Sequence, residues 1–241
     1  MLHRVQLPAS LARLAAEPDR AAVILDVDGT LAPIVDRPAG ARVPPTTQRE
    51  LERLRGRYAL IACVSGRSGA DARRLVGVDG IEYVGSHGLE LEPEAAEWRE
   101  RLVEFARAVD WPVEDKGVTL SFHWRTAEDQ EAAEALLAGV ATRARAKGID
   151  ARFGRKVLEL RPPVHADKGT AVATLLARHG LRRAVYVGDD TTDVDAFHAL
   201  RDLELGVAVG VRSPELPLVV EQAADLLVDG PAGVVDLLRA L

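Results

Sequence analysis

The sequence predicts an α/β fold: a doubly wound parallel sheet with a smaller α+β domain inserted into it. Short apolar runs alternate with helical patterns along most of the chain, and continuous apolarity is typical of strands buried on both faces of a parallel sheet. Between about Pro93 and Pro163 the pattern changes to alternating polarity, which is typical of an antiparallel sheet with one exposed face. We therefore expect a core of residues 1–93 and 163–241 and an inserted domain of residues 94–162.

The core elements follow one another in a regular order after a short leading helix at 8–17. The predicted strands are "AAVILDV" (21–27), "YALIACV" (58–64), "EYVGS" (82–86), "AVYVG" (184–188), "LGVAVG" (205–210) and "DLLVD" (225–229). The predicted helices span 46–56, 68–76, 167–179, 193–200, 214–223 and 231–240. Strands that alternate with helices in this way indicate a doubly wound sheet with helices on both faces.

The inserted domain contains strands of a different kind. In "VTLSFHWR" (118–125) apolar and polar residues alternate, which predicts a half-exposed strand. The segment "ARFGRKVLELRP" (151–162) predicts two more short strands around Gly154. Helices are expected at 94–109 and 127–147, so this part of the chain is predicted to form an α+β domain of its own.

Composition limits the classes of function that the chain could have. The 241 residues are enough for one or two domains, and 47% of them are apolar, as in a globular protein. With a net charge of -6 and no basic patch, we expect no nucleic-acid partner and a small-molecule ligand instead. Cys63 is the single cysteine, which excludes a disulfide scaffold. No signal peptide or membrane-spanning run is recognisable, so we expect a soluble cytoplasmic protein.

Carboxylates gather where two of the predicted strands end. Asp26 closes the first strand and Asp28 follows it, while Asp189, Asp190 and Asp193 follow the fourth. Ligands of an open parallel sheet bind beyond the carboxyl ends of its strands, so these groups should meet in space. Because so many carboxylates cannot all ionise together unaided, the pattern predicts a hard cation with oxygen ligands, and Mg²⁺ is the natural choice.

This set of residues predicts phosphoryl transfer. Carboxylates with Mg²⁺ and Lys168 attract a phosphate, and Ser65, at the end of the second strand, is able to donate to its oxygens. Asp26 could then attack phosphorus and form an aspartyl-phosphate. Asp28 could protonate the leaving oxygen and later activate water. The metal and Lys168 would stabilise the charge of the transferring group.

Four short motifs, "DVDGTL", "SGR", "DKG" and "GDDTTD", occur in this order along the chain. Together they resemble the four motifs of the haloacid dehalogenase superfamily of phosphatases. The resemblance implies a haloacid dehalogenase-like core, with Asp26 as the nucleophile and Asp28 as the acid/base. It also implies that Ser65 and Lys168 bind the phosphate.

The same resemblance implies how the metal would be bound. Mg²⁺ would be held by Asp26, by the backbone carbonyl of Asp28 and by Asp189. Asp190 or Asp193 would orient metal-bound water. For Asp193 a second interpretation stays open, in which it caps the helix that follows it.

Polar residues of the inserted domain are the candidates for substrate specificity. Glu114 and Lys116 stand two apart in "VEDKG" and share one side of an extended chain. Arg125 lies on the polar face of its strand, and Arg155 shares a face with Glu159. Mixed charges of this kind suit a neutral polyhydroxyl ligand, because carboxylates accept hydrogen bonds from hydroxyls and Lys and Arg donate them. A solvated surface is the alternative interpretation.

Several longer segments are similar to one family of sugar phosphatases: "GSHGLE", "VEDKGVTLSFHWR", "GRKVLELRPPVHADKGTA" and "YVGDDTTDVDAF". They closely resemble the trehalose-6-phosphate phosphatase family. The resemblance extends through both the core and the inserted domain, which would be the cap over the phosphate site. The resemblance implies Mg²⁺-dependent hydrolysis of trehalose 6-phosphate in trehalose biosynthesis. Arg67 and His87 would line the boundary between core and cap. The residues implied to hold the sugars are Glu114, Lys116, Arg125, Arg155 and Glu159.

Two alternative functions remain open from the sequence, and His87 has a second interpretation. A related enzyme would act on sucrose phosphate or a mannosyl phosphoglycerate. A phosphate-sensing module without turnover would be expected to lack the nucleophile or the acid/base, and Asp26 and Asp28 are both present. His87 could instead be a turn residue that hydrogen-bonds the backbone. No obligate protein partner is evident.

Overall fold

The chain divides into two compact units. The computed structural model describes residues 7–34, 40–154, 156–214 and 216–241. Met1–Gly88 and Asp167–Leu241 form one unit, called the core unit below, and Leu89–Ala166 form the inserted unit. The predicted insertion at 94–162 lies inside the inserted unit.

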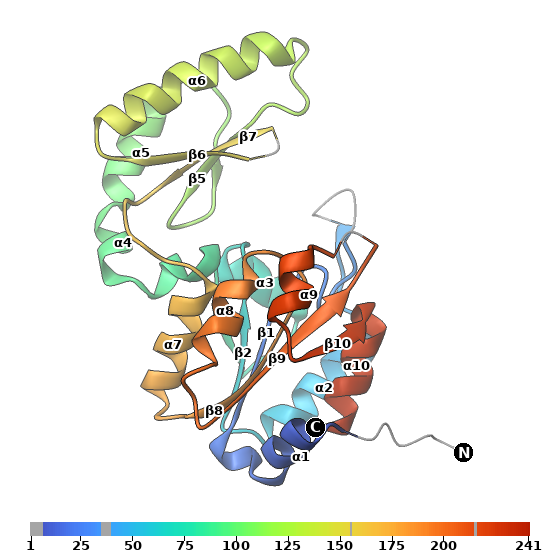
Figure 1. Ribbon diagram of the computed structural model, residues 1–241. Coiled ribbons are helices and arrows are strands. Elements are labelled where there is room, and N and C mark those ends of the chain that lie inside the picture. Colours follow the sequence, from blue (N-terminus) through green and yellow to red (C-terminus); the bar gives the residue numbers. More distant parts are fainter. Residues whose placement is uncertain (1–6, 35–39, 155, 215) are drawn as a thin grey trace. The chain divides into compact units, whose positions relative to one another are not determined.

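The core unit is built on a six-stranded parallel sheet with the strand order β10-β9-β8-β1-β2-β3 (Figure 1). Its strands are β1 (Ala22–Leu25), β2 (Leu60–Val64), β3 (Glu82–Val84), β8 (Arg183–Gly188), β9 (Leu205–Arg212) and β10 (Leu226–Asp229). The central strand β1 pairs in parallel with β2 on one side and with β8 on the other. The predicted parallel sheet is therefore confirmed, and each predicted core strand overlaps an observed one.

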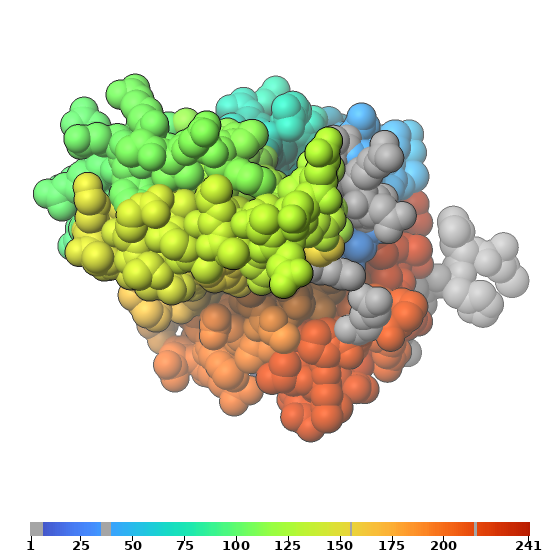
Figure 2. All heavy atoms as spheres, turned by 90° about the horizontal axis from the view of Figure 1, so that it is seen from above, coloured from blue at the N-terminus to red at the C-terminus, as the bar shows by residue number. Residues whose placement is uncertain are grey.

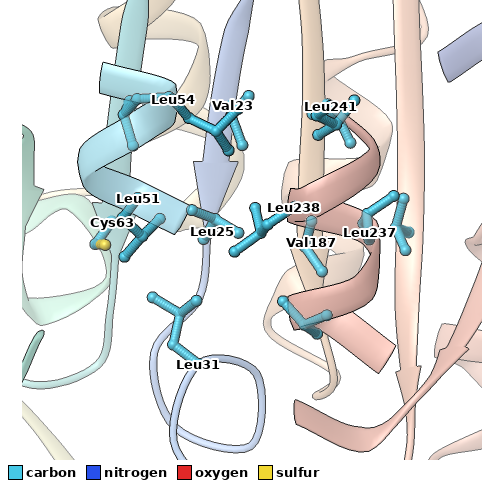
Figure 3. Packing of buried hydrophobic residues seen from close by; sticks show 14 of the residues in the cluster. Val23, Leu25, Leu31, Leu51, Leu54, Cys63, Val187, Leu237, Leu238 and Leu241 are labelled. Carbon is cyan, nitrogen blue, oxygen red and sulfur yellow. The ribbon is translucent and has the colours of Figure 1, made fainter. Parts of the chain in front are cut away.

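Helices cover both faces of this sheet (Figure 1). They are α1 (Ala9–Ala16), α2 (Pro45–Arg55), α3 (Gly69–Val76), α7 (Lys168–Arg178), α8 (Asp193–Ala199), α9 (Leu218–Ala223) and α10 (Gly230–Ala240). Apolar residues of α1, α2, α3 and α10 join alternate strand residues in one buried cluster. Figure 3 shows Leu51 and Leu54 of α2 and Leu238 of α10 beside Val23 and Leu25 of β1. Strand side chains alternate between the two faces of the sheet. The strand side chains outside this cluster therefore point to the opposite face, which α7, α8 and α9 cover.

Local sequence sets the ends of the two helices that follow the motif loops. The Ser68 side chain caps α3 by accepting a hydrogen bond from the backbone N–H of Asp71. At the start of α7, Asp167 and Thr170 form a capping box, in which each side chain bonds the backbone of the other residue. This box fixes Lys168 as the first residue of α7, where its side chain is buried.

The inserted unit contains a four-stranded antiparallel sheet with the order β4-β5-β7-β6. Its elements are α4 (Pro93–Glu97), α5 (Arg99–Arg107), β4 (Glu114–Asp115), β5 (Leu120–His123), α6 (Gln130–Ala146), β6 (Asp150–Gly154) and β7 (Val157–Arg161). Residues of α5, α6 and one face of the sheet form a separate apolar cluster. Figure 2 shows α6, in yellow-green, beside the green segment that contains α5. This unit therefore has a core of its own.

Two predictions for the inserted unit need correction. The helix expected at 94–109 is two helices, α4 and α5, which meet at Trp98. The strand expected to be half exposed is buried on its polar side over its first half, since Thr119 and Ser121 are at most 1% exposed, whereas His123 and Arg125 are exposed as predicted. The reason is that β5 is an inner strand, and the Thr119 hydroxyl donates to Glu159 of β7 at 3.1 Å.

The helices of the structure were compared with the length and hydropathy of membrane-spanning helices. Among the residues that the model describes, none of the helices combines the length and the apolar character needed to cross a bilayer.

Candidate active site

The first motif forms a tight turn at the end of β1. The backbone N–H of Asp26 still donates to Val187 of β8 at 2.9 Å, so this residue is held in the sheet and is 4% exposed. The chain then reverses, and the N–H of Gly29 donates to the carbonyl of Ala32 at 2.8 Å. Gly29 has a φ of 83°, a left-handed conformation that favours glycine.

The end of β8 brings a second set of carboxylates to the same edge of the sheet. Carboxylate oxygens of Asp26, Asp189 and Asp193 all lie within 4.8 Å of one another, and the three residues are buried. Lys168 joins them from α7: its Nζ lies 2.7 Å from Asp26 Oδ1 and 2.7 Å from Asp193 Oδ1. Residues that are far apart in the sequence thus form one buried polar cluster, as their positions at strand ends predict.

Two glycines make this close approach possible. A Cβ atom on Gly29 would lie 2.0 Å from Asp189 Oδ2, and one on Gly188 would lie 2.2 Å from the carboxylate carbon of Asp193. Both distances are far shorter than any contact between real atoms. A side chain at either position would therefore displace one of the clustered carboxylates.

The cluster carries more negative charge than its lysine neutralises. Burial, together with the charge of Asp193, raises the pKa of Asp189 to about 6. Burial and the neighbouring carboxylates also raise the pKa of Asp26, against the opposing effect of Lys168. Burial alone would lower the pKa of the Lys168 ammonium, but its contacts with Asp26 and Asp193 raise it. Three carboxylates beside one ammonium fit a hard divalent cation with oxygen ligands.

Asp193 is already saturated by donors from the chain. Its Oδ1 accepts from Lys168 and from the Tyr186 hydroxyl at 2.6 Å. Its Oδ2 accepts from the backbone N–H groups of Asp189 at 3.0 Å and Asp190 at 2.9 Å. With four donors already bound, this carboxylate is suited to positioning Lys168 and the loop after β8. Asp26 and Asp189 have more free lone pairs for a metal.

Tyr186 and Thr30 belong to this network, although sequence analysis assigned neither of them a role. The Tyr186 hydroxyl donates to Asp193, and the Thr30 hydroxyl donates to Asp189 Oδ1 at 3.2 Å. The sequence could have indicated a role for Tyr186, because the hydroxyl of a tyrosine inside a buried strand needs a hydrogen-bond partner. Thr30 stood inside the "DVDGTL" motif that marked the site.

Asp28 lies outside the buried triad and is paired with Arg67. Two bonds of 2.6 Å join the Arg67 guanidinium to both carboxylate oxygens of Asp28. This bidentate arrangement fixes the plane of the Asp28 carboxylate. Ser65 is 1% exposed, and its Oγ accepts from the backbone N–H of Arg67 at 3.2 Å.

A strained turn supports this loop from β3. Ser86 and His87 both have positive φ values, 50° and 53°, which non-glycine residues rarely adopt. The N–H of Ser86 donates to Arg67 and that of His87 donates to Ser65, at 2.7 and 3.0 Å. The His87 ring also lies against Gly66, where an added Cβ would come within 2.7 Å of it. These contacts favour the interpretation of His87 as a turn residue.

Asp190, a predicted metal residue, is placed apart from the triad. It is exposed, and its Oδ1 accepts from the backbone N–H of Thr191 at 2.7 Å. The triad of buried carboxylates does not include it.

The predicted sugar residues lie on the polar side of the inserted unit's sheet. Glu114 Oε2 lies 2.7 Å from His123 Nε2 and 3.6 Å from Lys116 Nζ. Lys116 Nζ in turn lies 4.0 Å from Glu159 Oε1, so these residues form a continuous row. Arg125 is exposed just beyond β5, and its carbonyl accepts from the Gln130 side chain at 2.8 Å. Arg155 lies outside the described residues.

Comparison with known proteins identifies relatives of both sequence and fold. A trehalose-phosphate phosphatase of Mycobacterium marinum is 34% identical over 243 residues. This match covers 88% of the chain and 60% of the M. marinum protein. A Mycobacterium tuberculosis protein named as an uncharacterized glycosyl hydrolase is 37% identical over 217 residues, which cover 79% of the chain but 16% of that protein. The chain thus spans only part of these relatives.

A solved structure supports the same fold. The Aspergillus fumigatus trehalose-6-phosphate phosphatase superposes with a TM-score of 0.63 at 24% identity, covering 96% of this chain and 95% of that one. The family model described as trehalose-phosphatase matches residues 24–112 and 105–221, which include both the strand-end motifs and the whole of the inserted unit. From the matched motifs, the buried cluster and the shared fold, we conclude that this chain belongs to the trehalose-phosphatase family.

Proposed function

We propose that this protein hydrolyses trehalose 6-phosphate to trehalose and phosphate, with Mg²⁺ and through an aspartyl-phosphate on Asp26. The observation that carries the proposal is the buried cluster at the strand ends, where Asp26 lies against Lys168 and close to Asp189. Family membership supports the substrate, since the relatives that share these motifs include trehalose-phosphate phosphatases.

Asp26 is the proposed nucleophile. One of its carboxylate oxygens attacks phosphorus, the bond from phosphorus to the sugar oxygen breaks, and the phosphoryl group passes to Asp26. Lys168 and Ser65 stabilise the phosphoryl oxygens during this transfer. Mg²⁺, held by Asp26, Asp189 and the backbone carbonyl of Asp28, would neutralise part of the charge on the transferring group.

Asp28 is the proposed acid and base. It donates a proton to the leaving sugar oxygen, and it later accepts a proton from the water that hydrolyses the aspartyl-phosphate. The bidentate contact with Arg67 gives Asp28 a defined orientation, since both oxygens are held at 2.6 Å. We therefore propose Arg67 as a residue that positions Asp28, in addition to its predicted place at the substrate.

The row of polar residues on the inserted unit's sheet is proposed to recognise the sugar. Glu114, Lys116 and Glu159 alternate in charge along it, a pattern that suits a neutral polyhydroxyl ligand. Arg125 and Arg155 stay in the proposed set on the strength of the family resemblance.

Phosphate release from a panel of sugar phosphates tests this function. The panel holds trehalose 6-phosphate, sucrose 6-phosphate, glucose 6-phosphate and a mannosyl phosphoglycerate, each assayed with Mg²⁺ and with EDTA. We expect trehalose 6-phosphate to be hydrolysed fastest and EDTA to abolish turnover. A different preferred substrate would keep the mechanism and overturn the substrate assignment. Release from none of them would favour a phosphate-sensing module.

A further inference from the structure

Among the described residues of the inserted unit, Arg161 and Ser121 carry buried polar atoms that have no hydrogen-bond partner. Arg161, the last residue of β7, is 6% exposed, and its Nε and Nη2 atoms are both unpaired. Ser121 of β5 is fully buried, and its Oγ is unpaired as well. Buried polar groups are nearly always hydrogen-bonded in native proteins, so each of these groups needs an explanation.

The two groups lie on one face of the sheet, on either side of Glu159. Ser121 of β5 is directly opposite Glu159 of β7 in the antiparallel pairing. Arg161 stands two residues after Glu159 on the same strand, and side chains two apart point to the same face. The unpaired groups therefore belong to the face that carries the row from Glu114 through Lys116 to Glu159.

The nearest carboxylates do not compensate Arg161. Asp150 is opposite Arg161 in the pairing of β6 with β7, but its carboxylate bonds Arg152 at 2.8 Å. Glu159 accepts from Thr119 at 3.1 Å and faces Lys116 at 4.0 Å. Burial and the charge of Arg152 lower the pKa of the Arg161 guanidinium, and the opposing effects of Glu159 and Asp150 do not cancel them. A buried donor without an acceptor costs folding free energy, which a bound acceptor would recover.

We propose that Arg161 and Ser121 determine specificity by donating hydrogen bonds to hydroxyl oxygens of the sugar. This inference rests on the proposed function and extends its set of sugar contacts. A neutral polyhydroxyl group suits the face because it offers acceptors to Arg161 and donors to Glu159 at once. An anion suits it less, because Glu159 and Asp150 flank the guanidinium and would repel it.

The variant Arg161→Met tests the proposal, with Arg143→Met as its matched control. Arg143 is an exposed arginine of the same unit and lies in the last turn of α6, away from the polar face of the sheet. Three quantities are measured in full-length protein: the melting temperature without ligand, and kcat/KM for a sugar phosphate and for p-nitrophenyl phosphate. The sugar phosphate is the one that the wild type hydrolyses best in the panel above.

For Arg161→Met we expect kcat/KM for the sugar phosphate to fall about 10- to 100-fold, the range for lost hydrogen bonds to a charged group. The value for p-nitrophenyl phosphate should change far less, and the melting temperature should stay equal or rise, because an unpaired buried charge is removed. Ser121→Ala should show a selective loss of about 3- to 10-fold. Arg143→Met should leave both substrates at wild-type rates.

Other outcomes overturn the inference. A lower melting temperature of Arg161→Met with equal losses on both substrates would show that Arg161 supports the fold. Unchanged specificity at wild-type stability would show that it does not contact the sugar. If Arg161→Met fails to fold, Arg161→Lys keeps the charge without the fork of donors, and its unchanged specificity would overturn the inference too. Failure of the proposed function is distinguishable, since it would appear in the wild type as another preferred substrate or none.

Discussion

Burial of the Asp26 carboxylate lowers the stability of the fold but places this group where the proposed chemistry needs it. It directly follows a strand whose four residues are all buried, in a place where an ionised carboxylate is costly. Lys168 compensates part of that cost at 2.7 Å, but Asp189 and Asp193 add negative charge again. The remaining imbalance explains why the site suits a cation and a phosphoryl group.

Replacement of Asp26 by Asn should abolish turnover and preserve the fold. Asparagine matches the shape of aspartate but cannot attack phosphorus as a carboxylate does, so kcat should fall by about 10⁴-fold or more. Phosphate release in single-turnover and steady-state assays measures this, with circular dichroism as the check on folding. Normal turnover of a variant shown by mass spectrometry not to be deamidated would exclude Asp26 as the nucleophile.

Asp189 links the metal site to stability. Its pKa of about 6 in the folded, metal-free chain lies above the ordinary 3.8, so the folded state holds this proton more tightly than the unfolded state does. Ionisation therefore destabilises the fold as pH rises through 6, by ~3 kcal/mol for a shift of about two pH units. The effect is absent at pH values below the ordinary value, where both states are protonated.

The variant Asp189→Asn should therefore melt a few degrees higher than the wild type at pH 7.5 without metal. The difference should shrink as the pH is lowered toward 4. Added Mg²⁺ should raise the melting temperature of the wild type and leave that of the variant unchanged. Differential scanning fluorimetry across pH, with EDTA or Mg²⁺, measures both effects. A variant that melts lower at pH 7.5 would contradict this account of Asp189.

At the scale of elements, helix α7 delivers the lysine to the carboxylates. The capping box of Asp167 and Thr170 fixes where the helix begins, and Lys168 is its first residue. Lys168 Nζ reaches two carboxylates at 2.7 Å each, so a small change at the helix start would alter both contacts. The cap thus connects local helix chemistry to the geometry of the site.

Loss of the cap should affect stability and activity together. Asp167→Ala is expected to cost about 1 kcal/mol, or roughly 2–4 °C in melting temperature, and to lower kcat as well. Asp129→Ala is the matched control, because Asp129 caps α6 in the inserted unit by accepting from the N–H of Ala132. It should lose similar stability while kcat stays near the wild-type value. Equal effects on kcat in both variants would argue against a special role for the α7 cap.

At the scale of the whole molecule, the two units carry different parts of the proposed function. Residues proposed for the chemistry belong to the core unit, whereas Glu114, Lys116 and Glu159 belong to the inserted unit. Each unit has an apolar cluster of its own. Catalysis and substrate choice should therefore be separable by mutation.

Glu159→Ala tests this separation. Hydrolysis of trehalose 6-phosphate should fall by about 10-fold or more in kcat/KM, because a carboxylate that accepts from sugar hydroxyls is lost. Hydrolysis of p-nitrophenyl phosphate, which has no sugar, should fall far less. Parallel kinetics on both substrates give the ratio, and equal losses would show that Glu159 supports the inserted unit's fold through Thr119.

Many features of the fold and of the candidate site could be predicted from the sequence, because the sequence patterns that indicate them are local. The buried runs that end in Asp26 and Ser65 identify parallel strands by their continuous apolarity. The rule that ligands bind beyond strand ends then predicts that Asp26, Lys168 and Asp189 meet, and they do. Periodicity and strand order are thus enough to place the candidate chemistry.

The tertiary structure alone decided which partner each polar group has. Asp193 looked equally suited to a metal or a helix cap, and the fold surrounds it with four donors, including Tyr186. Asp28 proved to be held by Arg67, which is 39 residues away in sequence. Arg161 proved to be buried, with its Nε and Nη2 atoms unpaired among the described residues. Hydrogen-bond pairing depends on distances of a few tenths of an ångström between distant segments, and residue type and spacing do not contain those distances.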